Sequence, residues 1–206
     1  MIRDPTSLYQ GDISTGTKKV ARAISSVGSP FSLSVLLFIA LGLRIEDPSL
    51  RFGSIVACIA LAVVLPLAIV LHYSRKFDNK DGDIYRREDR RNPIMIGVAC
   101  YLLCLAALYA MIGLDLLTVM LVCYMVSTLL VGLVSLRWKI SIHATGVVGP
   151  AIGLAVAYPP YGGLLILVLP LVAWSRYVMK KHTPLQLAAG AALGAAVTLT
   201  VFSLLL

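Results

Sequence analysis

Long apolar runs separated by short polar segments organise this chain. The runs cover residues 27–43, 52–73 and 94–136, and the third contains a single charged residue, Asp115. A helix needs about 20 residues to cross the hydrocarbon core of a bilayer. The third run is therefore predicted to form two spans, hinged at Gly113-Leu114-Asp115.

Three further spans are predicted in the C-terminal part of the chain. They cover residues 140–158, the stretch from the turn at 159–163 to about residue 179, and residues 184–206. The predicted fold is an all-α, polytopic bundle of six to seven transmembrane helices, most simply seven. Small residues four apart, at Gly146/Pro150 and Gly190/Gly194, are expected to allow close helix packing. Pro66, inside the second span, is tolerated where neighbours satisfy the freed carbonyl.

The polar N-terminal segment, residues 1–26, precedes a membrane domain of residues 27–206. Lys18, Lys19 and Arg22 indicate a short surface helix within residues 1–26. The segment is too long and too polar for a cleaved signal peptide.

Composition places the chain among membrane proteins. Of its 206 residues 59% are hydrophobic and 14% are charged, whereas ordinary soluble domains carry about 25% charged residues. All four cysteines lie in apolar runs without a Cys-x-x-Cys pair, so they are read as small buried hydrophobes. The net charge of +8 suits anionic headgroups or phosphates. Nucleic acid is not an expected partner, because the basic residues lie in the polar segments between membrane spans.

The distribution of basic residues predicts an orientation. With seven spans, sixteen of the eighteen Lys and Arg residues fall on one face, and only Arg44 and Arg51 fall on the other. Cytoplasmic loops carry the excess of positive charge. The N-terminus and the basic face are therefore expected in the cytoplasm.

Candidate chemistry gathers on this basic face. Two of the three histidines follow basic residues there, in Lys139-x-Ser141-x-His143 and Ser175-Arg176-x5-His182. The third, His72, is read as an interfacial side chain. A polar loop rich in arginine, residues 74–93, belongs to the same face. Ionisable residues beside a bilayer are costly and mark functional sites.

These side chains suit phosphoryl transfer without a metal or another cofactor. Cationic groups stabilise the charge on the equatorial oxygens of the phosphoryl group. One neutral imidazole can attack the phosphorus, and one protonated imidazole can protonate the leaving oxygen.

Three motifs resemble those of the type 2 phosphatidic acid phosphatase superfamily, metal-independent membrane lipid phosphatases related to vanadium haloperoxidases. Ser175-Arg176-x5-His182 is similar to the third family signature, and Ile140-Ser141-Ile142-His143 is similar to the second, Pro-Ser-Gly-His. The region 80–93 is loosely similar to the first, a Lys six residues before Arg-Pro. The resemblance implies a haloperoxidase-like helical core.

The resemblance also implies roles for individual residues. His182 would be the nucleophile and His143 the acid. Gln186 stands where the family has an Asp, and it can orient the imidazole of His182 through its carbonyl without adding charge. The phosphate would be held by Arg176, by Ser141, by Lys139 as an added ligand, and by residues of the first segment, namely Arg90, Arg91, Arg87 and Lys80.

The expected function is a lipid phosphatase acting on phosphatidate, phosphatidylglycerophosphate or a polyprenyl diphosphate, with no cofactor and with membrane lipids around it. One alternative is a weak or inactive relative that binds phospholipid or a partner protein. Another is a CDP-alcohol phosphatidyltransferase, suggested by Asp81-Gly82-x2-Tyr85-Arg86, although the span that follows lacks the acidic metal ligands. The remaining acidic residues of the loop are read as solvated, and Lys180 and Lys181 as anchors at a span end.

Overall fold

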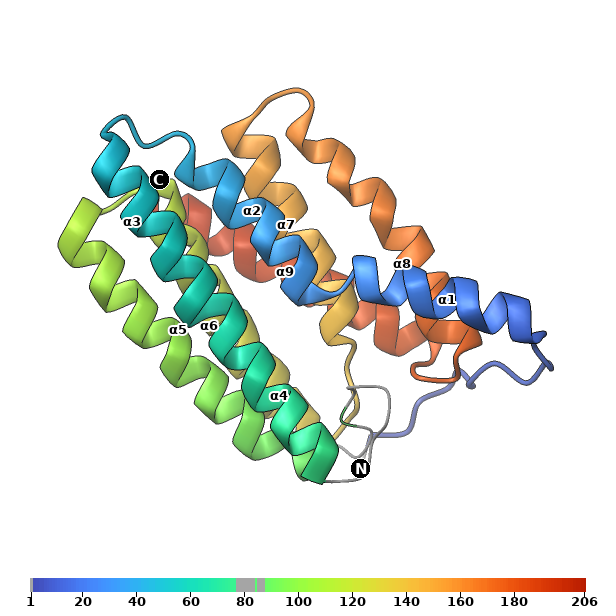
Figure 1. Cartoon of the computed structure of the whole chain (residues 1–206). Coiled ribbons are helices and arrows are strands. Elements are labelled where there is room, and N and C mark those ends of the chain that lie inside the picture. The colour runs from blue at the N-terminus through green and yellow to red at the C-terminus, as the bar shows by residue number, and fades with distance from the viewer. Residues whose placement is uncertain (1, 77–83, 85–87) are drawn as a thin grey trace.

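The computed structural model describes residues 2–76, 84 and 88–206, and every regular element in them is a helix (Figure 1). Five helical stretches are long and apolar enough to cross a membrane, and two shorter apolar helices accompany them. The chain thus has the helices of a multi-pass membrane protein. The elements are α1 (Thr15–Val27), α2 (Pro30–Gly42), α3 (Pro48–Ala57), the π-helix η1 (Cys58–Val64), α4 (Leu65–Lys76), the 3-10 helix η2 (Glu88–Arg90), α5 (Arg91–Ile112), α6 (Leu116–Ser135), α7 (Ile142–Ala157), the 3-10 helix η3 (Gly162–Leu167), α8 (Val168–Val178) and α9 (Pro184–Leu205).

The predicted hinge between the third and fourth spans is confirmed. α5 ends before Gly113, which adopts φ 68°, a conformation that favours glycine. Asp115 then accepts the amide of Leu117 and forms a capping box with Thr118 at the start of α6. The single charged residue of the long apolar run is therefore a helix cap.

The second span is one continuous stretch made of α3, η1 and α4. Pro66 lies just after the π-helical turn. A proline inside a helix lacks an N–H, and its ring presses on the carbonyl four residues earlier. A wider π turn before it relieves that crowding. The buried Pro66 ring thereby marks the place where the helix changes geometry.

The interface between α7 and α9 is unusually close. A Cβ atom on Gly194 would lie 2.8 Å from the carbonyl oxygen of Thr145, and one on Gly190 would collide with that of Ser141. The hydroxyl of Thr145 also donates to the carbonyl oxygen of Gly190 at 2.9 Å. The packing predicted from the Gly190/Gly194 spacing is confirmed.

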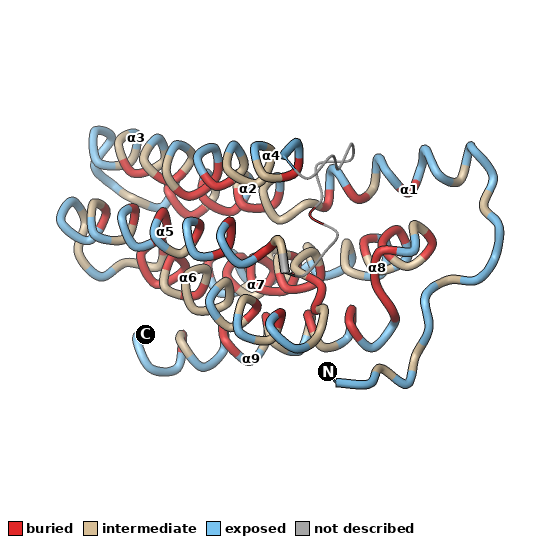
Figure 2. The backbone as a smooth tube through the Cα atoms, turned by 90° about the horizontal axis from the view of Figure 1, so that it is seen from below, coloured by how far each residue is buried: buried red, intermediate tan, exposed pale blue. Residues whose placement is uncertain are grey.

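The termini lie at opposite ends of the bundle (Figure 1). Buried residues face the interior of the bundle, whereas α1 is exposed along most of its length and packs on α8 (Figure 2). Lys18, Lys19 and Arg22 lie on α1, so a helix is present where the sequence predicted one. The main hydrophobic core lies among α2, α5 and α6, which bury Phe38, Leu108 and Met120 completely.

Candidate functional site

A cavity of about 360 Å³ opens at the end of the bundle that holds the starts of α5 and α7 and the turn between α8 and α9. No Asp or Glu side chain lines it within the described ranges. One side of it is cationic and imidazole-rich, formed by Arg22, Arg90, His143, Arg176, Lys181 and His182. His143 thus shares one cavity with Arg176 and His182, from which it is far apart in sequence.

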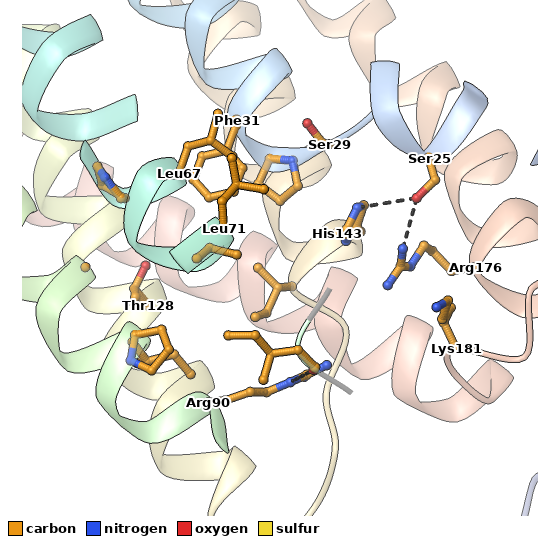
Figure 3. Close-up of a pocket in the computed structure, with 18 of the residues that line it drawn as sticks. Ser25, Ser29, Phe31, Leu67, Leu71, Arg90, Thr128, His143, Arg176 and Lys181 are labelled. Atoms are coloured by element: carbon orange, nitrogen blue, oxygen red, sulfur yellow. Dashed lines mark hydrogen bonds between the residues drawn. The ribbon is translucent and has the colours of Figure 1, made fainter. Parts of the chain in front are cut away.

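The other side of the cavity is apolar. Phe31, Leu67 and Leu71 face the cationic side across it (Figure 3), together with Pro66 and Val70. A smaller cavity of about 80 Å³ adjoins this side and shares lining residues with it, including Pro30, Ile94, Tyr101, Thr128 and Ile142. Together the two cavities lead from charged groups toward the interior of the bundle.

A tight turn after α8 brings Arg176 and His182 together. The amide of Lys181 donates to the carbonyl of Arg176 at 3.0 Å, and the amide of Lys180 donates to that of Tyr177 at 2.9 Å. This pair of bonds is the Schellman motif, which requires a left-handed residue at the position of Lys180. Lys180 indeed has φ 58°. The amide of His182 approaches the same Arg176 carbonyl at 3.4 Å, which explains the five-residue spacing between the two side chains.

Gln186 fixes the tautomer of His182. Its Oε1 atom lies 3.2 Å from Nδ1 of His182 and 3.3 Å from the backbone nitrogen of Thr183. A backbone N–H can only donate, so the side-chain atom it meets is the amide oxygen. That oxygen accepts from His182 as well, and Nδ1 therefore carries the proton. Nε2 of His182 keeps its lone pair, as an attacking imidazole requires.

His182 is held in its neutral form. Its side chain is only 2% exposed. Burial, followed by the charges of Arg176, Lys139 and Arg90 and the nearby His143, lowers the pKa of His182 well below its usual 6.5. At neutral pH the ring is therefore an uncharged base.

Ser25 of α1 connects the two other principal groups. Nη1 of Arg176 donates to Oγ of Ser25 at 2.9 Å, and the same oxygen lies 3.5 Å from Nε2 of His143 (Figure 3). Ser25 and Arg176 are both buried. α1 is thus a fourth segment of the site.

Ser141 supports the site from outside the cavity wall. It is fully buried, and its hydroxyl caps α7 by accepting the amide of Ala144 at 3.3 Å. Its own amide donates to the carbonyl of Gln186 at 3.2 Å. The start of α7, which carries His143, is thereby joined to the start of α9.

The remaining candidate residues fall into three groups. Arg90 is buried in the cavity wall, and its Nε donates to the carbonyl of Ile84 at 2.8 Å, whereas Arg91 is exposed and lines no part of the wall. Lys139 lies close enough for its charge to act on His182 without lining the cavity. Lys80 and Arg87 fall outside the described residues.

Sequence reasoning did not assign Ser25, Arg22 or Lys181 to the site. Nothing in the sequence near Ser25 signals its role, because it depends on the packing of α1 against α8. Lys181 was read as an anchor at a span end, yet it is only 9% exposed and lines the cavity. Its neighbour Lys180 is the exposed member of the pair.

The N-terminal segment is bound to the turn that carries His182. Oδ2 of Asp4 accepts from the hydroxyl of Thr183 at 2.6 Å, and the hydroxyl of Thr6 accepts from the amide of Leu185 at 3.3 Å. Desolvation of the Asp4 carboxyl opposes its ionisation, but the hydrogen bonds from Thr183 and Thr6 prevail and lower its pKa. Residues before α1 therefore stabilise the start of α9.

Comparison with known proteins adds no relative: no protein-family model, curated protein or solved structure matches this chain. In the described part of the chain, no three His, Cys, Asp or Glu side chains group as metal ligands would. What the site can do must be argued from its own geometry.

Proposed function

We propose that this protein is an integral-membrane lipid phosphatase that hydrolyses a lipid phosphate or diphosphate through a phosphohistidine intermediate. The observation that carries the proposal is the cavity itself. A neutral imidazole, a second imidazole and several cations line one side of it, and apolar residues line the other. Such a site suits a ligand with an anionic phosphate at one end and a hydrocarbon chain at the other.

In the first step, Nε2 of His182 attacks the phosphorus. An N–P bond forms as the bond between phosphorus and the lipid oxygen breaks. His143, protonated, gives its proton to that leaving oxygen, so the lipid departs as an alcohol or, from a diphosphate, as a monophosphate. Arg176, Lys181 and Arg90 stabilise the charge on the equatorial oxygens.

In the second step, water attacks the phosphohistidine. His143, now neutral, accepts a proton from the water as the new O–P bond forms. The N–P bond breaks, orthophosphate leaves, and Nε2 of His182 recovers its lone pair. Gln186 holds the Nδ1–H of His182 throughout, so both steps use the same tautomer.

The same proposal includes seven spans with a haloperoxidase-like core, counting α7 and the stretch of η3 and α8 as the two short spans. It places the site and the N-terminus on the cytoplasmic face. The charge bias supports this, since only two of the Lys and Arg residues belong to the opposite end, Arg44 in the turn after α2 and Arg51 in the first half of α3.

A panel of lipid phosphates and diphosphates, assayed for released phosphate in detergent with EDTA present, tests the proposal. We expect release by the wild-type protein and at least a thousandfold slower release by His182→Ala. The matched control is His72→Ala, because His72 is the third histidine of the chain and lines no part of the cavity. Activity that requires Mg²⁺ and a CDP-lipid would refute the phosphatase.

Gln186 favours a second candidate, a phospholipid-binding protein with little turnover. A carboxylate at this position would stabilise the cation that forms on the attacking ring, and an amide does not. Binding of lipid phosphates without phosphate release, unchanged in His182→Ala, is the result that this candidate predicts.

A further inference from the structure

Ser25 occupies a defined place between two groups of the site. Its oxygen accepts from Nη1 of Arg176 at 2.9 Å and lies 3.5 Å from Nε2 of His143 (Figure 3). A guanidinium can only donate, and a hydroxyl has one proton and two lone pairs. Arg176 therefore takes one lone pair of Ser25 and leaves the proton of its hydroxyl to another acceptor.

The identity of that acceptor depends on the protonation of His143. While Nε2 of His143 carries a lone pair, it can accept the long hydrogen bond from Ser25. In the proposed reaction, however, His143 is protonated when the substrate arrives, and a protonated imidazole has no lone pair to offer. An anionic phosphate oxygen in the cavity is then the acceptor for the hydroxyl proton of Ser25, and such charge-assisted bonds are strong.

We propose, on the basis of the phosphatase function above, that Ser25 of α1 is the hydroxyl ligand of the bound phosphate group. The resemblance assigned this part to Ser141. The hydroxyl of Ser141 instead caps α7 through the amide of Ala144, and Ser141 does not line the cavity. Ser25 does line it, 6% exposed and already bonded to the principal cation of the site.

The placement of α1 supports this assignment. Arg22 and Ser25 are three residues apart on one helix, so they lie on the same face, and both line the cavity. Ala21 and Ser25 are buried where α1 packs on α8, the helix that carries Arg176. The N-terminal helix thus contributes both a cation and a hydroxyl to the phosphate end of the cavity.

Calorimetric titration of the protein in detergent with orthophosphate tests the proposal apart from turnover. Ser25→Ala should weaken orthophosphate binding about tenfold or more, because it removes a hydrogen bond to a charged group. Ser135→Ala is the control, since Ser135 is also buried but does not line the cavity, and its affinity should stay within twofold of wild type. Ser141→Ala should lower the melting temperature and reduce phosphate affinity less than Ser25→Ala does.

A second pair of variants guards against misfolding of Ser25→Ala. Thr and Val have the same shape and differ in the hydroxyl alone, so Ser25→Thr should bind orthophosphate about tenfold more tightly than Ser25→Val. Equal affinities in this pair, or a loss in Ser141→Ala as large as in Ser25→Ala, overturn the assignment. If the wild type binds orthophosphate but releases none from lipids, the phosphatase fails while the Ser25 comparison still decides the ligand. A wild type that does not bind orthophosphate overturns both.

Discussion

Gly190 of α9 lies directly against the carbonyl oxygen of Ser141, at the residue before α7 begins. No Cβ fits between them, because the atom it would meet is backbone. His143 is two residues beyond Ser141, and Gln186, which orients His182, is one turn before Gly190. The separation of the imidazoles of His143 and His182 therefore depends on the absence of a side chain at residue 190.

Gly190→Ala is expected to push α7 away from α9. Overpacking a close interface costs about 1–3 kcal/mol of stability, and phosphate release should fall by more than the lost fraction of folded protein explains. Thermal unfolding and kcat at a temperature where the variant is folded separate these effects. Gly163→Ala is the control, because a Cβ there makes an ordinary 3.5 Å contact with Ala155. Full activity in Gly190→Ala would show that the imidazoles tolerate a wider interface.

Gln186→Leu is expected to lower kcat about 10- to 100-fold with a smaller effect on KM. Leu keeps the approximate shape but removes the oxygen that holds Nδ1–H of His182, a bond worth about 1.5–3 kcal/mol once the ring becomes charged. Gln186→Glu should recover activity, because Glu offers an oxygen and also serves at the third position of a capping box. If Gln186→Leu retains wild-type kcat, the amide has no part in orienting the ring.

Lys180→Gly is expected to stabilise the protein by about 1 kcal/mol. Lys180 has φ 58°, which costs a side-chain-bearing residue about 1–2 kcal/mol and costs glycine little. Part of the gain is lost to the greater freedom of glycine in the unfolded chain. Thermal unfolding in detergent measures the change, with Lys76→Gly as the opposite control, since glycine near the end of α4 should destabilise. A lower melting temperature for Lys180→Gly would contradict the left-handed turn.

Folding stability should fall as the pH drops below about 6.5. The pKa of His182 is lowered in the folded protein by burial and by neighbouring positive charge. The unfolded chain therefore binds a proton at His182 that the folded chain does not, and the loss continues until the pH reaches the folded-state pKa. Its slope approaches about 1.4 kcal/mol per pH unit. Unfolding of wild type and His182→Asn between pH 7.5 and 5.5 isolates this contribution, which should be absent from the variant; identical slopes would refute it.

The helical stretches long enough to cross a membrane follow from the sequence, because each contains a long run of apolar residues. The hinge at residues 113–115 was predictable for the same reason, as a glycine and one acidic residue interrupt an otherwise apolar run. The gathering of His143, Arg176 and His182 follows from their shared sidedness and local spacing. The apolar runs, the hinge and the short spacing between Arg176 and His182 are local properties of the chain, which a single sequence records directly.

Other features depend on tertiary packing or on an unexpected residue. Ser25 joins the site only because α1 packs on α8, and a serine in a polar helix carries no such signal. The left-handed turn after α8 has Lys180 where glycine is usual, so it could not be predicted from the sequence. Which of Lys180 and Lys181 enters the cavity follows from that turn. The structural role of Ser141, by contrast, can be predicted from the sequence, because a serine directly before an apolar run is typical of a helix cap.

The most direct test of the central claim is to trap the covalent intermediate. The protein is mixed with a lipid phosphate labelled with ³²P on its terminal phosphoryl group, quenched in alkali, under which phosphohistidine survives, and mapped by mass spectrometry. The mechanism predicts label on His182, none in His182→Ala, and a slower appearance of label in His143→Ala. Phosphate release without label on His182, or label on another residue, would contradict it.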